Sequence, residues 1–413
     1  MESIQLLAQA MPLTVSAAVL AYIAVGAALV SGPARGWFRR HLVMPNPSNQ
    51  SHLGSLDALR GLAAVWVVSF HSWQWWAFGT KSVLSASTFV QAGNKAVPVF
   101  VALSGFLIYR AVRGIGSIDD LRRYYWNRIL RIVPLCVASA VAIITIRQLG
   151  GAAPPGGHGV AELFMLRSLG YPLFANPPLW SLYVEIVFYL VAPLFVIATS
   201  RQATVAAVVM LAVLALSDGA GPREFELWKY FCVGILASEL HRVWRGRVQE
   251  WQALALIAAG ALWLGADIAG YDWLETYVRQ PNSYIWPAGR LTSYTLDLAA
   301  AAGLILTGAT LSRIAARITE WAPLRIVGAI SFSLFVWHSM LIMADGPLVF
   351  DGAGSILPRP VAVAPPPEWF RLLVMIPAFL AVAAVSFVLI EKPFLKLRRR
   401  RVVEAPVAAA VTG

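Results

Sequence analysis

Long apolar runs recur along the whole chain and are separated by short polar or Gly- and Pro-rich stretches. A helix that spans a bilayer needs about 20 consecutive, mainly apolar residues. The pattern therefore predicts an all-α polytopic membrane protein with about eleven transmembrane helices. We place the spans at residues 12–30, 56–78, 95–112, 129–148, 180–199, 203–217, 227–243, 251–269, 293–311, 325–343 and 371–391.

Composition and charge agree with this pattern. The 413 residues are 58% hydrophobic and 13% charged, with a mean hydropathy of +0.66, whereas a soluble domain has about 25% charged residues. If the N-terminus is outside, the inside segments hold 22 of the 33 Lys and Arg residues and the outside segments hold 10, with Arg60 set aside. This bias predicts an outside N-terminus and a cytoplasmic C-terminus. It also accounts for the net charge of +12 without nucleic-acid binding.

The chain divides into three parts. Residues 1–50 are expected to form an extra N-terminal helix and a cytoplasmic linker, because the first span lacks the positive segment of a signal peptide; cleavage of this segment is the alternative. Residues 51–397 form the main transmembrane domain, and residues 398–413 form a basic, disordered cytoplasmic tail. Of the two longer outside segments, residues 149–179 could roof a cavity, and the Pro-rich residues 344–370 are expected to form a surface loop.

Two polar residues in the second span are candidates for chemistry. Arg60 and His71 are eleven residues apart, which is about 16 Å along a helix and within about 20° of one face. They can line one cavity but cannot both touch one reacting bond. Asp57 lies within pairing reach of Arg60. The alternative is that Arg60 is an interface anchor and His71 a packing residue.

Other ionisable residues occur in the later spans. Arg128 and Arg131 lie on one helix face and suit phosphate groups, although topology anchoring explains such pairs equally well. Glu185, inside the fifth span, and His338 are functional candidates, because ionisable groups at membrane depth are costly. The alternative for Glu185 is a structural ion pair. HExxH and clustered metal ligands are absent from the sequence, so we expect no metal.

Five short motifs occur in a fixed order between residues 52 and 396. They are LDALRG with the Arg–x10–His helix, LSGFLI, R–x–x–R–x–x–P, WSLYVE and SFSLFVWH. Together they resemble the membrane-bound acyltransferase family 3. The resemblance implies a ten-helix core, so the first helix would be an addition. It also implies a location in the bacterial cytoplasmic (inner) membrane. Many relatives carry a fused extracytoplasmic SGNH-type domain that is not found here, so a separate partner of that type could complete the transfer.

The resemblance implies transfer of an acyl group, often acetyl, from cytoplasmic acyl-CoA to a hydroxyl of a glycan or other sugar-containing acceptor. In this interpretation Arg128 and Arg131, assisted by Arg60, hold the phosphates of the donor, and His71 is the general base. Glu185 would orient the imidazole or the acceptor. The expected acceptor contacts are Trp180, Ser181 and His338.

A second class of function remains open from the residues alone. A proton-coupled transporter or flippase of a glycan or lipid-linked substrate would also use buried Arg, His and Glu around a polar path. The Gly- and Pro-broken helices in matching halves that mark many transporters are not evident in the sequence. This absence favours the acyltransferase.

Overall fold

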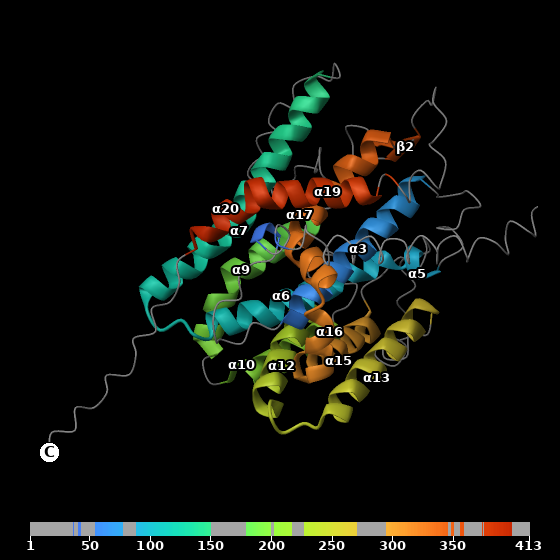
Figure 1. The fold of residues 1–413 in the computed structure, drawn as a ribbon. Coiled ribbons are helices and arrows are strands. Elements are labelled where there is room, and N and C mark those ends of the chain that lie inside the picture. Colours follow the sequence, from blue (N-terminus) through green and yellow to red (C-terminus); the bar gives the residue numbers. More distant parts are fainter. Residues whose placement is uncertain are drawn as a thin grey trace, which may run out of the picture.

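The structure is a computed structural model that describes residues 36, 40–42, 54–76, 88–149, 179–199, 202–216, 227–270, 295–345, 348–350, 356–358, 374 and 376–398. Three sequence-based predictions lie outside these residues: the span at 12–30, the interior of the 149–179 segment, and the tail beyond Arg398. Within the described ranges the fold is almost entirely helical (Figure 1).

For each predicted span after the first, the described chain has a helix over overlapping residues. The helices are α3 (Gly54–Trp76), η1 (Gly93–Lys95) with α6 (Ala96–Val112), α7 (Ile118–Leu149), α9 (Leu179–Thr199), α10 (Ala203–Leu216), α12 (Trp228–Trp244), α13 (Glu250–Ile268), α15 (Leu296–Leu311), α17 (Ala322–Asp345), and α19 (Ile376–Ser386) with η5 (Phe387–Glu391) and α20 (Lys392–Lys396). The apolar runs therefore locate the helices well.

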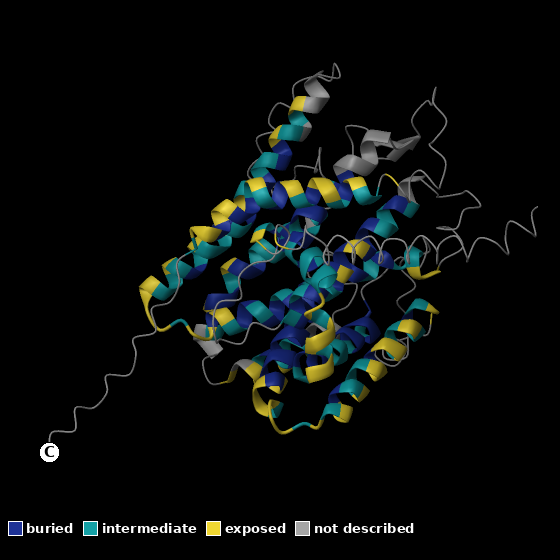
Figure 2. Ribbon diagram, viewed as in Figure 1, coloured by how far each residue is buried: buried dark blue, intermediate teal, exposed yellow. Residues whose placement is uncertain are grey.

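Three of the described helical segments are long and apolar enough to cross a membrane on their own. They are Gly93–Val112, Glu250–Ile268 and Ile376–Lys396. A fourth is added if α15 is joined to α16 (Arg313–Thr319), to which it is bent by 88°. The protein is thus a helical membrane protein, while the count of eleven spans stays a prediction. Figure 2 shows many exposed residues along α13 and α19 and mostly buried ones along α6 and α12.

Glycine pairs allow two pairs of helices to approach closely. A Cβ atom on Gly61 of α3 would lie 2.7 Å from the backbone nitrogen of Gly328 in α17, and one on Gly328 would lie 2.5 Å from the carbonyl oxygen of Asp57. The α6–α12 pair crosses in the same way at Gly105 and Gly234. Small residues let helix backbones approach closely, which is a common way of packing helices in membranes.

Helix α7 is longer than the span predicted at 129–148. Its 32 residues begin at Ile118 and correspond to about 48 Å at 1.5 Å per residue, more than the roughly 30 Å of a hydrocarbon core. The first turns carry acidic and basic side chains, among them Asp119 and Arg122, which form an exposed ion pair. The helix continues through Pro134. The charged residues that ended the apolar run therefore extend the helix without interrupting it.

A short antiparallel ribbon is the exception to the all-α prediction. Strand β1 (Leu348–Phe350) pairs with β2 (Ile356–Pro358), with Val349 opposite Leu357. Both strands lie in the Pro-rich segment that was expected to be a surface loop. Two short apolar runs on either side of the sequence DGAGS are a hairpin signal. Each run is much too short to span a bilayer, so the pattern of long apolar runs does not predict these strands.

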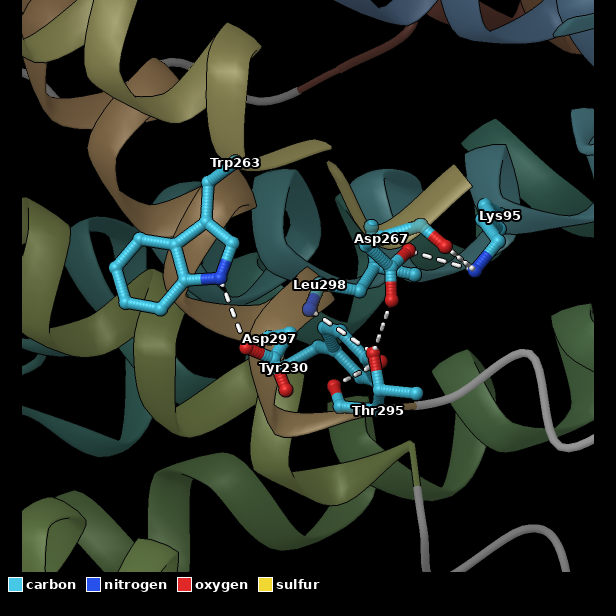
Figure 3. Close-up of polar contacts among 7 residues, drawn as sticks. All are labelled: Lys95, Tyr230, Trp263, Asp267, Thr295, Asp297 and Leu298. Carbon is cyan, nitrogen blue, oxygen red and sulfur yellow. Dashed lines mark hydrogen bonds and ion pairs between the residues drawn. The ribbon is translucent and has the colours of Figure 1, made fainter. Parts of the chain in front are cut away.

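A polar cluster joins α6, α12, α13 and α15 at the ends of these helices near Lys95 (Figure 3). Lys95 Nζ lies 2.6 Å from Oδ2 of Asp267, whose side chain is fully buried. The hydroxyl of Thr295 donates to Oδ1 of the same carboxylate (2.8 Å) and accepts from the backbone N–H of Leu298. Further hydrogen bonds run from Tyr230 to the Thr295 carbonyl and from Trp263 to Asp297. These contacts connect residues from different helices, so the cluster holds the helix ends together.

Candidate active site

A cavity with about 590 Å³ of empty space, part of it open to solvent, lies between five helices: α3, α6, α7, α9 and α17. A helix that turns an apolar side to the lipid or to the core has its polar residues on the opposite side, where they can line a cavity, because polar groups exposed at membrane depth are costly. Aromatic and aliphatic side chains make up the rest of the wall. The polar lining residues are Arg60, Ser104, Arg131, Ser181, Glu185, Tyr189 and Ser331.

Two guanidinium groups reach this cavity. Arg60 Nη1 lies 3.2 Å from Oδ1 of Asp57, one turn earlier on α3, as the spacing predicts, and 13% of the Arg60 side chain is exposed. Arg131 comes from α7 and has no ion pair among the described residues. Its charged neighbours are Glu185, Glu391 and Asp57. The donors of Arg131 are therefore available to an anion in the cavity.

Arg128 is not among the lining residues. Its guanidinium carbon lies 5.4 Å from the ring centre of Tyr124 and 4.9 Å from that of Tyr189, within range for a cation–π interaction. Three residues along a helix rotate the side chain by about 300°, so Arg128 and Arg131 point about 60° apart. Arg131 thus lines the cavity, whereas Arg128 lies against the rings of Tyr124 and Tyr189.

Glu185 lines the cavity and belongs to a local hydrogen-bond network. The hydroxyl of Ser104 donates to its Oε1 at 2.7 Å, and the hydroxyl of Tyr189, one turn later on α9, donates to the same oxygen. Its carboxylate also interacts electrostatically with Arg60 and Arg131. No described contact joins it to His71. The structure therefore groups Glu185 with the arginines, whereas the sequence suggested that it could orient the imidazole.

His71 and His338 form a hydrogen-bonded pair between α3 and α17. Nδ1 of His71 lies 2.9 Å from Nε2 of His338, and Nδ1 of His338 lies 2.6 Å from the carbonyl oxygen of Phe335. A carbonyl only accepts, so His338 carries its proton on Nδ1 and its Nε2 accepts when the ring is neutral. His71 must then donate from Nδ1. This leaves Nε2 of His71 as an unprotonated nitrogen.

Neither histidine is among the residues that line the cavity, but Phe335, whose ring centre lies 5.8 Å from that of His338, is one of them. Continuous helix from Gly54 to Trp76 keeps Arg60 and His71 about 16 Å apart along the axis of α3. Arg60 and His71 were expected to line one cavity, and of the two Arg60 is among its lining residues. The backbone of Trp180 lies in the first turn of α9, but its side chain is outside the described part.

Sequence reasoning missed three residues of this region. Ser104 and Tyr189 have signals in the sequence, because Ser104 lies within LSGFLI and Tyr189 follows Glu185 by four residues, one helical turn. For Glu391 the sequence points elsewhere, because a charged pair followed by a proline at the end of an apolar run is typical of a helix end. Glu391 is buried in η5, accepts a hydrogen bond from Ser333 (3.0 Å) and interacts with Arg131. In the part of the chain that the structure describes, no group of three His, Cys, Asp or Glu side chains could hold a metal ion.

The order of these residues along the chain can be compared with known families. A family model described as an acyltransferase domain matches residues 53–391. The chain belongs to the acyltransferase 3 family. The family predicted from the five motifs is therefore confirmed, and with it the class of enzyme, a transferase of groups other than aminoacyl groups.

The curated relatives of this chain include two named acyltransferases and one nodulation protein. Peptidoglycan O-acetyltransferase OatA of Listeria monocytogenes is 22% identical over 392 residues, which cover 84% of this chain and 56% of the relative. Nodulation protein 10 of Rhizobium leguminosarum is 24% identical over 395 residues, 85% of this chain and 96% of the relative. Acyltransferase MdmB of Streptomyces mycarofaciens is 33% identical over 159 residues, which cover 36% of this chain and 40% of the relative.

The chain spans about half the length of the peptidoglycan O-acetyltransferases that it matches. No solved structure matches it.

Proposed function

We propose that this protein is an integral membrane O-acyltransferase that moves an acyl group, in the simplest case acetyl, from acyl-CoA to a hydroxyl of a sugar-containing acceptor. The observation that carries the proposal is the hydrogen-bonded series from the Phe335 carbonyl through His338 to His71. It leaves Nε2 of His71 free to accept a proton. Family membership and the names of the O-acetyltransferase relatives support the reaction type.

In the proposed reaction His71 is the general base. Its Nε2 takes the proton of the acceptor hydroxyl as the oxygen attacks the thioester carbonyl carbon. The new C–O bond forms, the C–S bond breaks, and the leaving thiolate takes the proton from His71. The products are the O-acyl ester and free coenzyme A. His338, which accepts from Nδ1 of His71, would stabilise the imidazolium that exists between the two proton transfers.

The cavity would bind the donor. Arg131 and Arg60 would contact its phosphate groups, since guanidiniums bind phosphate in a bidentate manner and stay charged. Arg128, held over the ring of Tyr189, would add its positive charge to the attraction of the phosphate groups. The roughly 16 Å between Arg60 and His71 is comparable to the length of a pantetheine arm, which supports a donor lying along α3. Ser181, in the cavity wall, would contact the bound substrate. The carboxylate of Glu185 would offset part of the positive charge of the arginines.

The proposed setting is the bacterial cytoplasmic membrane, with the N-terminus outside and the C-terminus inside. The donor would then enter from the cytoplasm and the acceptor from the opposite side. The excess of Lys and Arg in alternate loops supports this orientation. A separate extracytoplasmic partner of the SGNH type would complete the transfer where the acceptor lies beyond reach of the membrane domain.

The test uses purified full-length protein with radiolabelled acetyl-CoA and a panel of acceptors, including peptidoglycan fragments and lipid-linked sugars. We expect His71→Ala to abolish labelled ester formation while coenzyme A binding, measured on the same preparation, is retained. Arg131→Gln should raise the KM for acetyl-CoA. The matched control is Arg122→Gln, which changes an exposed arginine on the same helix.

Each outcome bears on one part of the proposal. Ester formation by His71→Ala at the wild-type rate would exclude His71 as the base. Equal KM values for acetyl-CoA in the Arg131 variant, the Arg122 control and the wild type would remove the cavity arginine from donor binding. Transport of a labelled glycan without any ester product would contradict the proposed acyl transfer and favour a transporter.

A further inference from the structure

Arg398 is a buried cation that the proposed reaction does not yet use. It follows α20, and α20 and η5 pack against α7, the helix that carries Arg128 and Arg131. Its Nε atom is buried and, among the described residues, has no hydrogen-bond partner. A buried donor without a partner is costly and rare in folded proteins. Such an atom indicates a position prepared for a group that is not part of this chain.

The charged neighbours of Arg398 indicate the sign of that group. The guanidiniums of Arg131 and Arg128 and the carboxylate of Glu391 interact with it electrostatically. Burial, together with Arg131 and Arg128, lowers the pKa of Arg398 to about 9. Glu391 offsets only part of this repulsion, because it also interacts with Arg131 and Arg60. A further anion would relieve the repulsion among the arginines.

A comparison of charges supports an anion site. The linked set contains four guanidiniums, those of Arg60, Arg128, Arg131 and Arg398, and three carboxylates, those of Asp57, Glu185 and Glu391. Only Arg60 has an ion pair within this set. Among the described residues of this set one positive charge is left over, and the donors of Arg131 and Arg398 are not used in ion pairs there.

An arginine that only anchors a helix end in the lipid headgroups has a different environment. Arg122 on α7 is an example of a surface arginine, since 76% of its side chain is exposed and it pairs with Asp119. Arg398 instead buries its Nε beside two like charges. Anchoring gains nothing from such burial, whereas binding of a phosphate group gains the bidentate geometry of guanidinium.

We propose that Arg398, together with Arg131 and Arg128, forms a binding site for a phosphate group of the acyl donor, next to the cavity at its Arg60 end. This inference rests on the proposed function, because it takes coenzyme A as the donor. It adds to the donor site a residue that lies beyond the five sequence motifs and far along the chain from the two arginines of α7.

The experiment compares Arg398→Gln, Arg398→Lys and the control Arg122→Gln as full-length protein in a neutral detergent. Coenzyme A binding is measured by titration calorimetry at two salt concentrations. We expect Arg398→Gln to lower the affinity about tenfold or more, with a weaker dependence on salt than the wild type. Arg398→Lys, which keeps the charge but loses the planar fork, should fall between the two. The control should bind like the wild type.

Thermal unfolding without ligand separates this role from a structural one. Removing a repelled cation should leave the melting temperature of ligand-free Arg398→Gln equal to or above that of the wild type. A lower melting temperature with unchanged affinity for coenzyme A would overturn the proposal. The same measurement in nanodiscs of phosphatidylcholine with or without phosphatidylglycerol tests a lipid phosphate. If Arg398→Gln removes stabilisation by phosphatidylglycerol but not binding of coenzyme A, the site belongs to a lipid and the proposal fails.

Failure of the proposed function gives a different result. In that case the wild-type protein itself would not bind coenzyme A, whatever residue stands at position 398. Normal binding by the wild type and by Arg398→Gln alike would leave the proposed function intact and exclude only Arg398.

Discussion

Replacing His338 by Leu tests whether the histidine pair acts in the reaction. The substitution removes the acceptor 2.9 Å from Nδ1 of His71 and leaves an apolar side chain at a fully buried position. A hydrogen bond between neutral groups contributes about 0.5–1.5 kcal/mol and one to a charged group about 1.5–3 kcal/mol. The bond is therefore stronger by about 1–1.5 kcal/mol once His71 is protonated. Only this difference affects kcat.

At 1.36 kcal/mol per factor of ten, the expected decrease in kcat is about 5- to 13-fold. The decrease is larger if the imidazole of His71 also changes its tautomer, since the wrong tautomer costs far more in Ser-His-Asp enzymes. The KM for the donor should not change, because His338 does not line the cavity.

The assay is steady-state ester formation with the purified variants. His338→Gln should recover most of the rate, because its carbonyl oxygen can accept from Nδ1 of His71. In a His71→Ala background, His338→Leu should cause no further decrease. The reasoning is refuted if His338→Leu has the wild-type kcat, or if it lowers the residual rate of His71→Ala by the same factor as in the wild type.

Three further predictions concern stability and can be checked by thermal unfolding in detergent. Lys95→Met should destabilise the protein by about 3–5 kcal/mol, because it leaves the fully buried carboxylate of Asp267 without its cation; a Lys95→Met/Asp267→Leu double variant should recover much of this loss, and no recovery would contradict the explanation. Gly328→Val should lower both the melting temperature and kcat, since a Cβ there would meet a backbone oxygen of α3 at 2.5 Å, whereas Gly265→Ala, with nothing within 4 Å, should do neither. Glu239→Gln should cost less than Lys95→Met, because its two arginine partners are about half exposed and can turn to water; an equal or larger loss would show that exposure does not decide the cost.

Local pattern was sufficient to locate the helices. Each apolar run from residue 56 onward corresponds to a described helix, because a long apolar run leaves the backbone no other way to satisfy its hydrogen bonds in lipid. The pairing of Arg60 with Asp57 followed from a spacing of three residues. Contacts within one helical turn depend on neighbours in sequence, so they can be predicted from the chain alone.

Contacts between helices depend on information that spacing does not contain. His71 and His338 are 267 residues apart, and no periodicity relates them. The sequence places Arg128 and Arg131 on one helix face, but it does not show that the ring of Tyr189 from α9 lies against Arg128 and that Arg131 lines the cavity. A charged pair before a proline at the end of an apolar run is typical of a helix end, so the sequence gives no sign that Glu391 interacts with Arg131. In each case the packing partner decides the role.

The crossing of α3 and α17 at Gly61 and Gly328 has a consequence for how this protein can vary. His71 follows Gly61 by ten residues, and His338 follows Gly328 by ten residues. The two helices therefore run parallel from a common point of contact and reach the histidine pair after equal lengths. Many side chains in between are buried, such as those of Val67 and Leu334, and the number of residues in between is constrained as well as their size. One inserted residue in either helix would advance its histidine by 1.5 Å and rotate it by about 100°.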